Sequence, residues 1–95
     1  MTAKEKLLTP EELGVICKAL GHAARVRIIQ HLKIEQRCIC GEIVEILPLS
    51  QSTVSQHLKQ LKTAGLVKGE VEGPKTCYCL NMELFERFKD TVNQL

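Results

Sequence analysis

Residues 49–67, LSQSTVSQHLKQLKTAGLV, decide the fold of this chain. Apolar side chains recur at Val54, Leu58 and Leu61, the spacing of one buried face of a helix. Ser50 stands where a side chain would cap the start of that helix. The other faces are rich in glutamine, serine, threonine and lysine, the residue types that contact bases and phosphates of DNA. The stretch therefore predicts a helix that reads DNA.

The candidate DNA contacts lie on this helix, with one further lysine downstream at the expected tip of a wing. Glutamine reads base edges, serine and threonine bind bases or phosphates, and lysine neutralises phosphate. The candidates are Gln51, Ser52, Thr53, Ser55, Gln56, His57, Lys59, Gln60, Lys62 and Lys75. His57 has a second interpretation, as the cap of a side-chain network. A solvated polar helix face is the general alternative for the stretch taken alone.

The neighbouring segments favour DNA binding over a merely solvated face. Residues 41–47, GEIVEIL, predict a short helix that ends at Pro48, and two helices joined by a short turn form a helix-turn-helix. Residues 66–72 and 76–80 read as strands separated by a Gly-Pro turn, which predicts a β-hairpin. Helices followed by such a hairpin make a winged helix-turn-helix.

Two helices are predicted before this unit. Thr9 and Pro10, followed by two glutamates, are typical of a helix start, and the helix is expected over about residues 10–20. Residues 23–33 predict a second helix that buries Val26, Ile29 and Leu32.

The last helix is expected over residues 82–95. Phe85, Phe88 and Val92 form a stripe with the 3,4 spacing of helices that pack on a partner. Together with Leu13 and Ile16 of the first helix, this stripe predicts a homodimer, because a chain of 95 residues has too little core to cover both helices.

Composition limits the class of protein. Ninety-five residues make one domain, and 44% hydrophobic with 25% charged residues excludes disorder of the whole chain. Net charge is only +2, but residues 50–68 hold three lysines and no acid, a local basic strip. No apolar run approaches the ~18 residues of a membrane span, so we expect a soluble, cytoplasmic protein without a membrane partner. No nucleophile with an oriented partner and no phosphate-binding glycine loop is evident, so neither catalysis nor an organic small-molecule substrate is expected.

The stretch 49–67 resembles the recognition helix of the ArsR/SmtB family of metal-responsive bacterial repressors. Residues 19–32, ALGHAARVRIIQHL, are similar to the family's second helix, with Arg25 at its usual arginine, and residues 69–81 are similar to its wing. The resemblance implies a mainly α winged helix-turn-helix over residues 1–95, with the helix-turn-helix at about 41–65 and the wing at about 66–80.

The same resemblance implies how such a protein works. It would bind a palindromic operator in double-stranded DNA as a homodimer joined through its first and last helices, at about 10–20 and 82–95. No cofactor would be required for DNA binding, and an inducer would release the repressor.

Cys38 and Cys40 stand where the family carries its CxC metal motif. The resemblance suggests an inducer held by thiolates, As(III) or Sb(III) first, with Cd(II), Pb(II) or Zn(II) as alternatives. A third cysteine often lies three residues further on in the arsenite-type pattern, but that position here is Ile43. The family's interhelical zinc site is not expected, because the acids of the last helix have no histidine nearby.

Cys77 and Cys79 are the candidates for the missing ligand. In winged helices the segment before the third helix forms a strand that pairs with the returning wing strand, which would place these cysteines beside Cys38 and Cys40. Residues i and i+2 of a strand share a face, and cross-strand Cβ atoms lie ~4.5 to 5.5 Å apart. Three or four thiolates could therefore converge on one soft ion.

Two alternatives remain for the cysteines. Cys38 could form a reversible disulfide with Cys77 or Cys79 if their Cα atoms lie within ~7 Å, which would make the protein a thiol-redox or polysulfide sensor. Cys17, on the expected apolar side of the first helix, is interpreted mainly as a small core residue and otherwise as a ligand.

Overall fold

The computed structural model describes residues 7–35, 38–40, 48–69 and 77–95. Its elements are α1 (Pro10–Ala19), α2 (Ala23–Glu35), β1 (Ile39–Cys40), α3 (Gln51–Thr63), β2 (Val67–Gly69), β3 (Cys77–Leu80) and α4 (Met82–Asn93). This order agrees with the predicted mainly α fold with a β-hairpin. The predicted helix 41–47, the turn of the wing and Lys75 lie outside the described residues. No described helix is long and apolar enough to cross a membrane.

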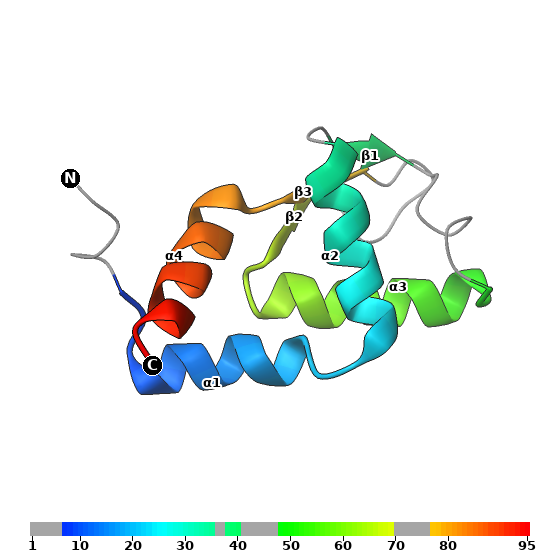
Figure 1. The fold of residues 1–95 in the computed structure, drawn as a ribbon. Coiled ribbons are helices and arrows are strands. Elements are labelled where there is room, and N and C mark those ends of the chain that lie inside the picture. Colours follow the sequence, from blue (N-terminus) through cyan, green and yellow to red (C-terminus); the bar gives the residue numbers. More distant parts are fainter. Residues whose placement is uncertain (1–6, 36–37, 41–47, 70–76) are drawn as a thin grey trace.

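The helices α1 and α4 lie together on one side of the molecule, and α2 and α3 lie on the other (Figure 1). A buried threonine of α4 joins the first pair: the backbone N–H of Leu8 donates to Oγ1 of Thr91 at 2.9 Å. The hydroxyl of Thr91 in turn donates to the carbonyl of Arg87 at 2.7 Å. The segment before α1 is thereby fixed to α4.

Both predicted helix caps are confirmed. Thr9 forms a capping box with Glu12, in which each side chain accepts a hydrogen bond from the other residue's backbone N–H, at 3.1 and 2.9 Å. Ser50 caps α3 by accepting from the backbone N–H of Thr53 at 3.2 Å. These bonds satisfy donors that the first turn of a helix leaves without partners.

Gly65 ends α3 and directs the chain into β2. Its N–H donates to the carbonyl of Lys62 at 2.9 Å, and the N–H of Leu66 donates to the carbonyl of Leu61 at 3.0 Å. This is the Schellman arrangement, which needs a residue with positive φ, and Gly65 has a φ of 89°. The side chain of Asn81 donates to the carbonyl of Gly65 at 2.9 Å and so ties the start of α4 to this turn.

The core is mainly aliphatic, and it includes the aromatic side chain of Tyr78. Its largest fully buried side chains are Ile28, Leu32, Ile39, Val54, Leu58, Leu61 and Leu66. The predicted burial of Val26 is wrong, because this side chain is 38% exposed. The predicted burial of Ile29 and Leu32 is confirmed, and Ala24 and Ile28 complete the buried face of α2 in place of Val26.

The three strands form an antiparallel sheet in the order β1-β3-β2. Ile39 pairs with Tyr78, and Cys40 with Cys77. On the other edge of β3, Lys68 pairs with Cys79. The predicted pairing of the segment before the third helix with the returning wing strand is confirmed, and it places β3 between the two other strands.

Candidate functional site

The exposed face of α3 carries most of the predicted DNA contacts. The side chains of Val54, Leu58 and Leu61 are buried against the core, which turns the opposite side of the helix to solvent. The exposed candidates are Gln51, Ser52, Gln56, Lys59, Gln60 and Lys62, while Thr53 and Ser55 are half-buried. The described part of this helix therefore presents amide, hydroxyl and ammonium groups together, and none of them is acidic.

His57 is not on that exposed face, which corrects its assignment as a DNA contact. Its side chain is only 9% exposed, and its Nδ1 accepts a hydrogen bond from Nε of Arg25 at 3.1 Å. The alternative interpretation, membership of a side-chain network, is confirmed. Sequence patterns missed Arg25 as the partner because it precedes His57 by 32 residues on another helix.

The sheet formed by β1 and β3 has one buried face and one outer face. Ile39 and Tyr78 are 0% and 3% exposed, so one face of the sheet belongs to the core. Side chains alternate along a strand, and accordingly Cys38 is exposed while Cys77 and Cys79 are half-buried. Cys38, Cys77 and Cys79 thus lie on the outer face of the sheet.

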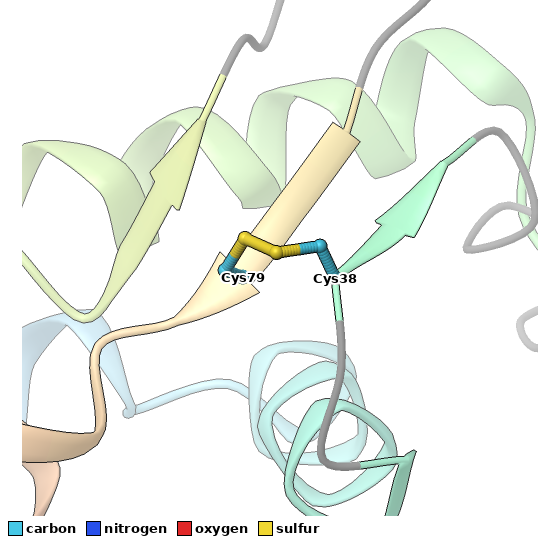
Figure 2. Close-up of a disulfide and its surroundings, with 2 residues drawn as sticks. All are labelled: Cys38 and Cys79. Atoms are coloured by element: carbon cyan, nitrogen blue, oxygen red, sulfur yellow. A yellow bond between two sulfur atoms is a disulfide. The ribbon is translucent and has the colours of Figure 1, made fainter.

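Two of these cysteines are joined. Figure 2 shows the disulfide between Cys38, the residue just before β1, and Cys79 of β3, whose Cα atoms are 4.3 Å apart. The cysteine pairing weighed in the redox alternative is thereby confirmed for this pair. Cys77 is disulfide-bonded as well.

Cys17 lies apart from this cluster. It is a free and exposed cysteine on α1, so its predicted place in the core is wrong. The buried positions of α1 are Ile16 and Ala19. In the disulfide-bonded state, the described residues contain no group of three or more histidine, cysteine or acidic side chains that could hold a metal ion.

The sequence and the fold of this chain are similar to those of known proteins. The family described as "Bacterial regulatory protein, arsR family" matches residues 22–68. The arsenical resistance operon repressor of Staphylococcus xylosus is 36% identical over 84 residues, which cover 88% of this chain and 76% of that repressor. This chain belongs to the ArsR family.

Two further similarities bear on this ArsR family chain. The HTH-type transcriptional repressor SmtB of Mycobacterium tuberculosis (strain ATCC 25618 / H37Rv) is 43% identical over 67 residues, or 70% of the chain and 49% of SmtB. The chain thus spans about half the length of that relative. A solved ArsR family transcriptional regulator has a TM-score of 0.77 at 17% identity, over 93% of this chain and 90% of that one. The predicted winged helix-turn-helix fold is confirmed, and a family of DNA-binding regulators confirms that the chain is not an enzyme.

The surface of this ArsR family chain also revises the predicted dimer stripe. Ile16 is 3% exposed and belongs to the core of its own protomer, and Phe85 and Phe88 pack partly against that core. The large apolar side chains left exposed on α1 and α4 are Val15 at 54%, Met82 at 47% and Val92 at 40%, and Leu95, after the end of α4, is 86% exposed. These residues are the ones a partner chain would cover.

We expect Lys59→Ala in this ArsR family chain to weaken DNA binding on every sequence alike. Lys59 lies on the exposed face of α3, where its ammonium group is placed to neutralise a phosphate. Loss of one phosphate contact lowers the slope of log K against log salt by ~0.9. Fluorescence anisotropy with labelled duplexes at several salt concentrations measures both effects.

Lys89→Ala is the matched control for this prediction. Lys89 lies on α4, where its Nζ is 3.1 Å from a carboxylate oxygen of Glu86. Its replacement should leave both affinity and salt slope at the wild-type values. Equal slopes for Lys59→Ala and the wild type would remove Lys59 from the phosphate contacts.

Proposed function

We propose that this protein is a transcriptional repressor that binds operator DNA as a homodimer and leaves it when its strand cysteines bind a thiophilic metal(loid). As(III) or Sb(III) is the foremost inducer, with Cd(II), Pb(II) and Zn(II) as alternatives. The observation that carries the proposal is the antiparallel pairing of β1 with β3, which brings the sulfur atoms of Cys38 and Cys79 within bonding reach of each other.

The proposed inducer site belongs to the reduced protein. Reduction of the Cys38–Cys79 disulfide leaves two thiols whose Cα atoms start only 4.3 Å apart on one face of the sheet. Thiolates prefer soft ions to hard ones, so magnesium and calcium are not expected to bind. A trivalent arsenic centre takes three thiolates, and the third would come from Cys40, with Cys77, opposite Cys40 in the strand register, as a candidate fourth ligand.

The proposed DNA contact is made by the exposed face of α3. This helix passes through Gly65 directly into β2, and β2 pairs with β3 through Lys68 and Cys79. Drawing β1 and β3 together around an ion would displace β2 and, through the tight turn at Gly65, change the orientation of α3. Coupling between two such sites is commonly ~1 to 3 kcal/mol, or roughly 5- to 150-fold in affinity.

The test uses reduced protein and a duplex that the protein itself selects from a random pool. Arsenite is expected to raise the Kd for this duplex by roughly 5- to 150-fold, as measured by fluorescence anisotropy. Cys38→Ser and Cys79→Ser should keep the Kd measured without arsenite and lose the response, because serine preserves size and removes the soft ligand. Cys40→Ser is expected to behave in the same way.

Cys17→Ser is the control, because that free cysteine lies away from the sheet, and it should respond like the wild type. The double change Cys77→Ser with Cys79→Ser should also abolish the response. A normal response of this double variant, with loss of the response in Cys17→Ser, would move the third ligand to α1 and contradict the strand site.

A second candidate, a thiol-redox or polysulfide-responsive repressor, is favoured by the disulfide itself. In that case two protein thiols react with an oxidant of the disulfide class, and the oxidant leaves as two thiols while Cys38 and Cys79 become linked. Oxidised glutathione in the absence of metal would then release the selected duplex, and arsenite added to reduced protein would not. Release by neither agent would leave a repressor without a cysteine-borne signal.

A further inference from the structure

A polar bridge joins the end of α1 and the start of α2 to the recognition helix α3. The guanidinium of Arg25 donates from Nη1 to the carbonyl of Ala19 at 3.2 Å and from Nε to Nδ1 of His57 at 3.1 Å. The ring of His22 lies against the ring of His57, with centroids 4.4 Å apart. Nδ1 of His22 accepts from the backbone N–H of Ala24 at 3.1 Å, which fixes the orientation of that ring.

The hydrogen bonds of the bridge restrict the orientation of α3 more than its apolar contacts do. The other buried side chains of α3 are Val54, Leu58 and Leu61, and hydrophobic contact is non-directional. A hydrogen bond to His57 has a preferred angle and length, so it limits rotation of α3 about its own axis. Gln56, the residue next to His57, is exposed to the DNA-facing side, and rotation of α3 would move it directly.

We propose that Arg25 and His57 are positioning residues for operator binding, and that the bridge holds only while Nδ1 of His57 carries no proton. Arg25 would keep the recognition helix in a fixed relation to α1, the helix on which dimerisation is expected to depend. This inference rests on the proposed DNA-binding function and adds a requirement to it.

Protonation of His57 would break the bridge because both partners would then be donors. Nδ1 accepts the hydrogen bond from Arg25, and a protonated imidazole has no acceptor nitrogen. The charged and titratable groups that act on His57 are Arg25 of α2 and His22 of the preceding turn. Both disfavour a positive charge on the His57 ring. Burial first, and then these two groups, lower the pKa of His57 below its usual 6.5, so it is neutral at pH 7.

The direction in which DNA affinity changes with pH distinguishes the bridge from simple charge attraction between histidines and phosphates. Phosphates attract protonated histidines, so simple charge attraction would strengthen DNA binding as the pH falls. The bridge predicts the opposite: binding is retained at neutral pH and lost as the pH falls through the lowered pKa of His57. We expect about a tenfold rise in Kd over the pH range from 7.5 down to below that pKa, the loss typical of one hydrogen bond to a charged group.

The experiment compares the Kd for the selected duplex across this pH range in three proteins. His57→Asn places a non-titrating acceptor, Oδ1, where Nδ1 stood, so it should bind at pH 7.5 and lose the acid sensitivity. His31→Asn is the matched control, since His31 lies on α2 outside the bridge, and it should keep the wild-type fall. Circular dichroism at each pH verifies that all three proteins are folded.

Arg25→Lys provides a second, independent test. Lysine keeps the positive charge but lacks the planar fork that holds the Ala19 carbonyl and His57 together, so affinity at pH 7.5 should fall. Unchanged affinity of Arg25→Lys, a wild-type Kd that is flat or improves in acid, or a parallel fall in His57→Asn would each overturn the inference. Failure of the wild type to select any duplex at pH 7.5 would overturn the proposed function first, and this inference with it.

Discussion

Reduction of the protein is expected to lower its free energy of unfolding by at least about 4 kcal/mol, the contribution of the Cys38–Cys79 disulfide alone. The disulfide joins residues with a sequence separation of 41, and a crosslink of that span restricts the unfolded chain much more than the folded one. Small domains are stable by only ~5 to 15 kcal/mol, so the loss would be a large part of the total. Urea unfolding followed by circular dichroism, with and without a reductant, measures the difference.

The control for this experiment is again Cys17→Ser. Cys17 is free, so this variant should lose as much stability on reduction as the wild type does. Equal unfolding free energies with and without reductant would show that Cys38 and Cys79 are not linked in solution. Alkylation of free thiols before digestion and mass spectrometry reports the state of each cysteine directly.

Tyr78→Ala is expected to cost ~3 to 5 kcal/mol of unfolding free energy, the range for removal of a large aromatic side chain from a core. Tyr78 is 3% exposed and lies in β3, where it pairs with Ile39 of β1 and with Gly69 of β2. Its burial determines which face of β3 points inward, and hence which face carries Cys77 and Cys79. Urea unfolding under oxidising conditions measures the loss without a contribution from reduction.

Lys68→Ala on the neighbouring strand is the comparison for Tyr78→Ala. Lys68 is exposed, and replacement of an exposed residue usually changes stability by no more than ~0.5 kcal/mol. A loss below ~1 kcal/mol for Tyr78→Ala would mean that the inner face of the sheet does not depend on this ring.

Local chemistry made much of the fold predictable. The Thr9 cap and the Ser50 cap each depend on residues a few positions apart, and each is found in the structure. The pairing of β1 with β3 was also predictable, because it follows from the general topology of a winged helix and from two cysteine pairs at matching spacing. The helix Gln51–Thr63 and its buried face, Val54, Leu58 and Leu61, likewise follow from the periodicity of apolar residues.

The side chains that depart from prediction have partners far away in the sequence. His57 lies at the edge between the buried and exposed faces of α3, where its polarity suggests exposure and only the distant Arg25 explains its burial. The sequence predicts Cys17 in the core because cysteine is commonly buried. In the structure the adjacent Ile16 is buried instead. Single-sequence periodicity cannot distinguish neighbouring positions at such an edge.

The division of the sheet into an inner and an outer face makes the chain a scaffold for redesign. Ile39 and Tyr78 hold the strands to the core, while Cys38, Cys77 and Cys79 are directed outward. Ligand types on the outer face could therefore be exchanged, for example imidazole for thiolate, without repacking the interior. Because β3 is hydrogen-bonded to β2, the strand that follows α3, a new ligand set placed there would connect a different chemical signal to the helix for which DNA binding is proposed.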